Sequence, residues 1–294
     1  MSKWETLKLR IITALVLFGV LAAATTLMPP FYYSLLIAVI MLRAGWEWTR
    51  FLGASGASGK VLYLLSLAVM MAGIFLLLGI TPTAVAIDEL RATMLLGLGQ
   101  FFWLFSAYLL RGYPANRDNW NDDSHIAAMG LFALLPVLVA IALLKYLLPS
   151  GLLVLALVVA VAAVDVGAYF SGIRFGRRKL APELSPNKTW EGVWGGLMLC
   201  LLLAAAMTWA MHRYLVPLSP VEMLLLLLLA CFVTLFSVIG DLMESMLKRN
   251  SNIKDSGRLL PGHGGLLDRV DGLIAAAPAF ALVMLIVINR STVL

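Results

Sequence analysis

The sequence has few charged residues: 13% of its 294 residues are Asp, Glu, Lys or Arg, whereas 62% are hydrophobic. Soluble domains average about 25% charged and roughly 45–50% apolar residues. A chain with so little polar material cannot cover a water-facing surface, which excludes a soluble enzyme, a disordered protein and a collagen-like fibre. The composition therefore predicts an all-α, polytopic integral membrane protein.

Cysteine is also scarce. The chain has two cysteines, Cys200 and Cys231, and both lie inside apolar runs. Two such cysteines supply neither a disulfide framework nor the ligand set of a zinc site. We therefore expect both to be small hydrophobic residues that are buried between helices.

Long polar stretches are absent as well, so the apolar runs follow one another closely. We predict about nine transmembrane helices, at residues 11–28, 31–52, 61–80, 92–110, 126–148, 151–171, 193–213, 222–247 and 269–289. We interpret the first as an uncleaved helix and not as a signal peptide, because further spans follow it. The predicted organisation is N-terminal transmembrane helices (1–110), a middle transmembrane segment (111–150) and a region with two cytoplasmic loops where catalysis is expected (151–294).

Basic residues are distributed unevenly between the two sides of such a bundle. If the N-terminus is cytoplasmic, the side of the membrane opposite the cytoplasm holds only four of the 22 basic residues, namely Arg91, Lys145, Arg213 and Arg290. Arg43 lies inside a predicted span, and the other basic residues are on the cytoplasmic side. The positive-inside rule then places the N-terminus in the cytoplasm and the C-terminus on the opposite side. The net charge of +6 is thereby attributed to cytoplasmic loops and a phosphate-binding surface, and no nucleic-acid partner is expected.

The densest polar cluster lies between Asp241 and Asp271. Asp241, Ser245 and Lys248 are spaced to share one face at the end of a predicted helix, and Asp268 and Asp271 share a face at the start of the next. Carboxylates can hold a divalent metal while basic residues bind phosphate oxygens, so this pattern is typical of a magnesium–phosphate site. The alternative is that the basic residues only set topology, but topology signals need no carboxylates.

A second polar group surrounds Asp165, which interrupts the predicted span 151–171. An acidic residue at such a position indicates either a functional site or a polar helix contact. Farther along, Thr189 can cap the helix that begins near Trp190, and Lys188 together with the amides of that helix start can bind phosphate. Thr189 is therefore either a plain N-cap or a phosphate contact.

Two other polar groups are interpreted as structural. Arg43 and Glu47 lie four residues apart in one predicted span, where they can form an ion pair. Asp122 and His125 belong to an acidic loop, which we interpret as a solvated loop and not as a metal site.

Residues 245–271 resemble the signature of the phosphatidate cytidylyltransferases, also called CDP-diacylglycerol synthases. The matching positions are Ser245, Leu247, Lys248, Arg249, Lys254, Asp255, Gly257, Leu260, Pro261, His263, Gly264, Gly265, Leu266, Asp268, Arg269 and Asp271. The Asp-x-Gly-Ala-Tyr block that begins at Asp165 and the residues 185–192 are also similar to that family. The first hundred residues match only as hydrophobic helices, and Val166 stands where relatives often carry a hydroxyl residue.

The resemblance implies transfer of CMP from CTP to phosphatidate, giving CDP-diacylglycerol and pyrophosphate. The lipid phosphate would attack the α-phosphorus of CTP in line, assisted by Mg2+, with a second metal ion left open. The implied partners are CTP, phosphatidate and the lipid bilayer, and a homodimer is left open. The implied location is the inner (cytoplasmic) membrane, as a multi-pass protein whose active site faces the cytoplasm.

Each candidate residue of the site receives a role on this basis. The catalytic candidates are Asp241, Ser245, Lys248 and Asp268. The substrate-binding candidates are Asp165, Lys188, Thr189, Arg249, Lys254, His263 and Arg269. The metal-ligand candidates are Asp241, Asp268 and Asp271. The role of His263 stays open between a structural residue and a phosphate donor.

Three other functions remain to be weighed. A CDP-alcohol phosphatidyltransferase would carry a different carboxylate run, which this sequence lacks. A relative that acts on another lipid phosphate stays open. A secondary transporter of a phosphorylated solute would show repeats and helices interrupted near the midplane, whereas the sequence shows no repeat and its charges gather at one face.

Overall fold

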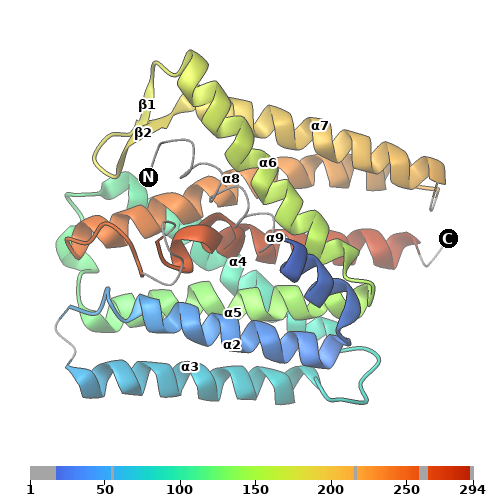
Figure 1. The fold of residues 1–294 in the computed structure, drawn as a ribbon, viewed down its shortest axis with the longest axis horizontal. Helices are drawn as coiled ribbons and strands as arrows, with labels where there is room; N and C mark the ends of the chain where they lie inside the picture. The colour runs from blue at the N-terminus through green and yellow to red at the C-terminus, as the bar shows by residue number, and fades with distance from the viewer. Residues whose placement is uncertain (1–17, 54–55, 215–216, 258–263, 292–294) are drawn as a thin grey trace, which may run out of the picture.

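The computed structural model of the protein describes residues 18–53, 56–214, 217–257 and 264–291 (Figure 1). They form a bundle of long helices with one short hairpin. After the helix Phe18–Leu27, the elements are α2 (Pro30–Trp48), α3 (Ala57–Leu78), α4 (Glu89–Gly112), η1 (Arg117–Asn119), α5 (Asp123–Leu147), α6 (Leu152–Phe175), β1 (Lys179–Ala181), β2 (Ser185–Thr189), α7 (Trp190–Tyr214), α8 (Pro220–Asn250) and α9 (Leu267–Ser291).

The predicted spans from 31–52 onward each coincide with one helix to within a few residues. In the described part of the chain, α3 to α9 are the seven helices long and apolar enough to cross a membrane. Helix α2 is shorter and carries two charged residues, and it is not among the seven. Residues 11–17 of the first predicted span lie outside the described residues. The protein is therefore a multi-pass helical membrane protein, and the total of nine spans stays a prediction.

Helix α5 lies at the centre of the bundle. It contacts α2, α3, α4, α6 and α9, and 78% of its most apolar window is buried. A helix that is hydrophobic on all sides has no face that requires water, so it can occupy the interior. Figure 1 shows α3, α2 and α5 stacked on one side and α7 with α8 on the other, with α4 and α9 between them.

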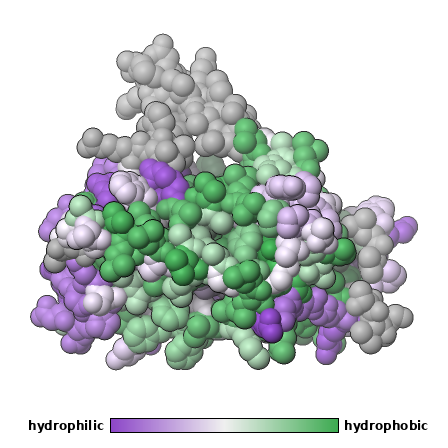
Figure 2. Space-filling view, turned by 90° about the horizontal axis from the view of Figure 1, so that it is seen from below, coloured by the Kyte–Doolittle hydropathy of each residue, from purple (hydrophilic) through white to green (hydrophobic). Residues whose placement is uncertain are grey.

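The surface is divided by hydropathy. Figure 2 shows hydrophobic side chains over the middle of the visible face and hydrophilic residues toward its two sides. Large apolar side chains are exposed on the outer helices, such as Leu76 (83% exposed) and Phe101 (70% exposed). In water such a belt would be unstable, whereas lipid tails solvate it at no cost.

The expectation for the two cysteines is half wrong. Cys200 is buried in α7, but Cys231 is exposed on α8. An apolar run in a membrane helix has lipid-facing and protein-facing sides of similar polarity. Hydrophobicity alone therefore could not tell on which side Cys231 would lie.

Helices α6 and α7 cross at backbone distance, and glycines make this possible. A Cβ atom on Gly167 would lie 2.5 Å from the carbonyl oxygen of Gly195, and one on Gly196 would lie 2.7 Å from that of Val164. Small residues at a membrane helix crossing allow such an approach and the packing contacts that come with it. The crossing fixes Asp165, on α6, beside α7.

The prediction of a purely helical chain missed one element, the antiparallel hairpin of β1 and β2. Strand β2 continues directly into α7, and the Trp190 amide donates to the Arg178 carbonyl at 2.9 Å. The Glu191 carboxylate also accepts a hydrogen bond from the Arg177 amide at 3.1 Å. These contacts hold Lys188 at a strand–helix junction and not on a free loop.

Candidate active site

The C-terminal part of α8 and the first turns of α9 lie against each other. A Cβ atom on Gly240 would overlap the carbonyl oxygen of Asp271, and one on Gly272 would overlap the Ser237 hydroxyl. The two helices can touch this closely because both positions are glycine. The contact places Asp241, next to Gly240, alongside Asp271.

Three carboxylates and one lysine meet at this point. The Lys188 ammonium of β2 forms an ion pair with Asp241 of α8. Asp165 of α6 interacts electrostatically with Asp241 and Lys188, and Asp271 of α9 interacts with all three. We call Asp165, Asp241 and Asp271 the acidic cluster. The side chains of Lys188 and Asp241 are 25% and 37% exposed, so a solute can reach them.

The structure thus joins the two polar groups of the sequence into one site. Ser245 contributes as its spacing predicts, since its hydroxyl donates to Asp241 at 3.4 Å. That distance makes the hydrogen bond a weak one. Three helices and one strand therefore supply the charged groups.

A second lysine organises the neighbouring part of the site. The Lys248 ammonium lies 2.7 Å from Asp268 Oδ1 and 3.2 Å from Glu244 Oε2. The other oxygen of Asp268 accepts hydrogen bonds from the Ser256 amide, the Ser256 hydroxyl and the Gly265 amide, at 3.0, 2.9 and 2.8 Å. Both oxygens of Asp268 are thus engaged by protein groups, which hold the loop between α8 and α9.

Glu244 of α8 also belongs to this part of the site, although it is not among the predicted site residues. This residue is 5% exposed, and it interacts electrostatically with Asp271 and Asp268. Within the described residues its Oε1 accepts no hydrogen bond. The four-residue spacing between Glu244 and Lys248 could have revealed the pair, because i, i+4 residues share a helix face.

Thr189 is the N-cap of α7. Its hydroxyl oxygen accepts a hydrogen bond from the Gly192 amide at 3.2 Å, and the residue is 7% exposed. The capping interpretation is confirmed, and a contact between Thr189 and phosphate stays a prediction. The Gly192 amide belongs to the first turn of α7, whose amides have no hydrogen-bond acceptor within the helix, so a side-chain cap is needed to satisfy it.

Of the remaining predicted residues, the structure describes Arg249, Lys254 and Arg269. Arg249 Nε donates to the Leu184 carbonyl in the hairpin turn at 3.3 Å, so Arg249 also ties α8 to the hairpin. Lys254 and Arg269 are exposed, in the loop after α8 and in the first turn of α9. His263 lies outside the described residues.

The acidic cluster suits magnesium by its donor chemistry. Its three carboxylates face one ammonium group, Lys188, so the cluster has excess negative charge that a divalent cation would neutralise. Among the described residues no three His, Cys, Asp or Glu side chains are grouped closely enough to hold a metal ion by themselves. Magnesium commonly takes one or two carboxylates and completes its shell with water and substrate phosphates. Asp241, with Asp271 beside it, fits that arrangement better than Asp268, because the Asp241 side chain is 37% exposed, whereas that of Asp268 is 11% exposed and its Oδ2 accepts three hydrogen bonds from the loop.

The acidic loop before α5 has a different role. Asp122 caps α5, because its carboxylate accepts hydrogen bonds from the amides of Ser124 and His125 at 3.0 and 3.1 Å. A hydrogen bond from the His125 side chain is the main cause that lowers the pKa of Asp122, and the His125 amide adds to it. These bonds account for the pairing of Asp122 and His125 without a metal.

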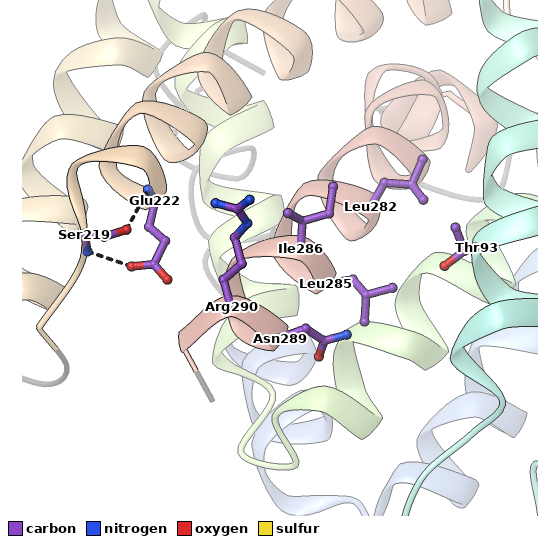
Figure 3. A pocket seen from close by; sticks show the side chains of 8 residues that line it. All are labelled: Thr93, Ser219, Glu222, Leu282, Leu285, Ile286, Asn289 and Arg290. Carbon is purple, nitrogen blue, oxygen red and sulfur yellow. Dashed lines mark hydrogen bonds between the residues drawn. The ribbon is translucent and has the colours of Figure 1, made fainter. Parts of the chain in front are cut away.

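A pocket of about 590 Å³ lies at the other end of α8 and α9. It is lined by Thr93, Ser219, Glu222, Leu282, Leu285, Ile286, Asn289 and Arg290 (Figure 3). Ser219 and Glu222 at its edge form the capping box of α8. Among the described residues its lining includes none of the predicted site residues, so it is separate from the acidic cluster.

Comparison with known proteins covers almost the whole chain. Residues 8–287 match the model of the cytidylyltransferase family. The chain is 41% identical over 275 residues to a phosphatidate cytidylyltransferase of Pseudomonas aeruginosa, covering 94% of this chain and 96% of that protein. A phosphatidate cytidylyltransferase of Haemophilus influenzae is 36% identical over 288 residues, covering 94% of this chain and 97% of the relative. The chain belongs to the cytidylyltransferase family.

Proposed function

We propose that this protein is a phosphatidate cytidylyltransferase, an enzyme that transfers CMP from CTP to phosphatidate and releases pyrophosphate. Relatives that carry this name match the chain nearly from end to end. The structural observation that supports the proposal is the convergence of Lys188 with the acidic cluster at one end of a membrane helix bundle. Such a site suits a polyanionic nucleotide that meets a lipid phosphate at a membrane surface.

The reaction needs little more than positioning and charge stabilisation. A phosphatidate oxygen attacks the α-phosphorus of CTP in line; the new P–O bond forms as the bond to the β-phosphate breaks, and pyrophosphate leaves. The attacking phosphate monoester has a second pKa of about 6, so it is already ionised near pH 7 and needs no general base. The site must therefore align two anions and stabilise the charge that develops between them.

The charged residues divide this work. Lys188 is partly exposed, and among the described residues its direct ion pair is with Asp241, so it can exchange Asp241 for a triphosphate oxygen when CTP binds. Asp241 and Asp271, with Asp165 nearby, would hold magnesium, which neutralises phosphate charge when bound. Lys248 and Asp268 keep the loop and the start of α9 in place. Arg249 supports the hairpin that carries Lys188.

We also propose the orientation of the chain and its location. The end of the bundle that carries the acidic cluster also carries the loops richest in Lys and Arg, and the positive-inside rule assigns such loops to the cytoplasm. The N-terminus is then cytoplasmic and the C-terminus lies on the opposite side of the inner membrane, after nine spans. CTP reaches the site from the cytoplasm, and phosphatidate reaches it from the membrane. A homodimer stays a prediction.

The enzyme proposal is tested with purified protein, labelled CTP and phosphatidate in mixed micelles. We expect magnesium-dependent formation of CDP-diacylglycerol and an equal amount of pyrophosphate. Asp241→Asn should lower kcat by roughly 10²-fold or more, because it removes one charge from the site that stabilises the transition state. The size-exclusion profile and thermal midpoint should stay close to those of the wild type.

A control for this variant is Glu89→Gln. Glu89 is an acidic residue far from the acidic cluster, and it accepts a hydrogen bond from Asn289 at 3.0 Å. The control should retain wild-type turnover. A wild-type protein that forms no CDP-lipid would refute the proposed function, and full activity in Asp241→Asn would refute the role of that carboxylate.

The transporter alternative gains no specific support. Each of the seven candidate spans in the described part of the chain is one continuous helix. Transporters of this class bind their solutes at interrupted helices near the midplane. Here Lys188 lies in a hairpin outside the spans, and Asp271 lies in the first turns of α9.

A further inference from the structure

Glu47 lies at the end of α2, and it is buried against the loop that precedes α9. The residue is 1% exposed. Its Oε1 lies 3.1 Å from Arg43 Nη2, so the ion pair predicted from their spacing is present. Its Oε2 accepts a hydrogen bond from the Leu267 amide, the first residue of α9, at 2.9 Å. Glu47 thus caps a helix that begins 220 positions later in the sequence.

Ser256 connects Glu47 to Asp268. Ser256 is fully buried, and its hydroxyl lies 2.9 Å from Asp268 Oδ2 and 3.3 Å from Glu47 Oε2. A hydroxyl has only one hydrogen to donate. The Ser256 hydroxyl therefore shares its hydrogen between the two carboxylates, with the shorter contact to Asp268, and the Leu267 amide is a further donor to Glu47. The contacts therefore run from Glu47 through Ser256 to Asp268 and on to Lys248.

The carboxylate of Glu47 rests against two glycines of the loop. A Cβ atom on Gly257 would overlap Glu47 Oε1, and one on Gly265 would lie 2.6 Å from Glu47 Oε2. Any side chain at these two positions would push the carboxylate away from the backbone. The loop is thus shaped to receive this acidic residue, which explains why two positions of the signature are glycine.

Arg50, one turn after Glu47, holds the same loop from its other side. Its Nη1 donates to the carbonyl oxygens of Asp255 and Ser256, at 3.0 and 2.8 Å. The Arg50 guanidinium thus donates to backbone carbonyl oxygens of the loop, whereas the Glu47 carboxylate accepts from a backbone amide. The end of α2 fixes the loop before α9 by both charges.

We propose that Glu47, supported by Arg50, is a positioning residue for the active site. Among the described residues, its ion pair and hydrogen bonds are with Arg43, Ser256 and Leu267 and not with Lys188 or the acidic cluster. It fixes the first turn of α9, and so it sets where Asp268 meets Lys248 and where Asp271 faces the acidic cluster. A carboxylate at a helix N-terminus is favoured by the helix dipole as well as by hydrogen bonds to the first amides. This inference rests on the proposed cytidylyltransferase activity.

The test compares Glu47→Ala with a matched control, Glu222→Ala. Glu222 is also 1% exposed and also accepts a hydrogen bond from a backbone amide at a helix start, that of Ser219 at 2.7 Å, but at the opposite end of α8. We expect both variants to lower the thermal midpoint. Because a displacement of about 1 Å can cost 10²-fold in rate, Glu47→Ala should lower kcat by roughly 10- to 100-fold, whereas Glu222→Ala should leave it within about twofold.

Glu47→Gln supplies a conservative comparison. The amide oxygen of Gln can still accept the hydrogen bond from Leu267, so this variant should regain most of the kcat lost in Glu47→Ala. If Glu47→Ala does not fold, Arg50→Met is compared with Glu222→Gln in the same assay, and we expect kcat to fall in Arg50→Met only. Equal kcat values in Glu47→Ala and Glu222→Ala, or in Arg50→Met and Glu222→Gln, would overturn the proposal.

A double-variant cycle with Ser256→Ala separates positioning from general stability. If Glu47 acts through Ser256 and the loop, the double variant should lose little more kcat than the worse single variant. Losses that multiply would contradict the pathway through Ser256. An inactive wild type would refute the proposed function itself, whereas an active wild type with an unaffected Glu47→Ala variant would refute only this inference.

Discussion

Lys188 and Lys248 illustrate how residues of one type serve different purposes in this site. Among the described residues Lys188 forms its ion pair with Asp241, with Asp165 and Asp271 farther off, and it keeps 25% of its side-chain surface exposed. Lys248 is 17% exposed and lies between the carboxylates of Glu244 and Asp268. A cation that is partly exposed and has one direct ion pair can exchange its partner for a phosphate, whereas a cation in direct contact with two carboxylates holds the structure together.

Substitution of each lysine by methionine should separate the two roles. Lys248→Met leaves two carboxylates close together without their cation, and breaking such an enclosed pair typically costs about 3–5 kcal/mol. Lys188→Met should change the thermal midpoint much less and should instead lower kcat/KM for CTP. Thermal unfolding in detergent and steady-state kinetics measure the two effects. A Lys188→Met protein as unstable as Lys248→Met would contradict this division.

Several residues of the site could be predicted from the sequence, but only where the contact is local in the chain. Asp241, Ser245 and Lys248 are placed by helix spacing, and Thr189 is recognised as a cap by its position before α7. Glu47 was interpreted only as the partner of Arg43. Local spacing predicted that ion pair, but no local rule predicts a contact with Leu267, 220 positions away.

At the scale of elements, the crossing of α6 and α7 depends on glycine. Gly167 and Gly196 bring the two helix backbones together, and this holds Asp165 beside α7, where it interacts electrostatically with Lys188 of β2. The hairpin then carries Lys188 to Asp241 on α8. The geometry of the acidic cluster is therefore sensitive to the distance between α6 and α7.

Two alanine substitutions with opposite expected effects test this point. In an ordinary helix Gly→Ala stabilises by about 0.5–1 kcal/mol, and Gly97 on α4 has open space around a new Cβ atom. Gly97→Ala should therefore keep or raise the thermal midpoint. At Gly167 the Cβ atom would lie 2.5 Å from a backbone oxygen, so Gly167→Ala should lower it and reduce activity. Equal thermal midpoints for the two variants would contradict this prediction, because they would show that α6 and α7 can move apart without loss of stability.

The hairpin of β1 and β2 was not predicted. Its strands have three and five residues, too few for a period-two pattern to stand out, and the second contains Pro186. The pairing depends on contacts with Arg249 and Glu191 from neighbouring helices. Tertiary contacts, and not strand propensity, therefore decide this element.

At the scale of the whole molecule, the proposed orientation places the acidic cluster at the cytoplasmic surface. It can be tested with single cysteines in a background that carries Cys200→Ala and Cys231→Ala. Asn187→Cys lies in β2 and Thr83→Cys lies in the connection between α3 and α4, and both positions are exposed. A membrane-impermeant maleimide should label Thr83→Cys in spheroplasts and Asn187→Cys only after lysis. The reverse pattern would overturn the orientation.

The sequence by itself determined the class of the protein, the positions of its helices and its family. Apolar runs of membrane length must be helical, because lipid offers the backbone no hydrogen bonds, and the signature from Ser245 to Asp271 is contiguous. Only the tertiary structure decided that Asp165, Asp241 and Asp271 meet around Lys188, and that Glu47 holds the start of α9. Lipid and protein interior are similarly apolar, so hydrophobicity does not fix how a helix is rotated or which helix lies beside it. Backbone approach at glycines and a few buried hydrogen bonds make that choice.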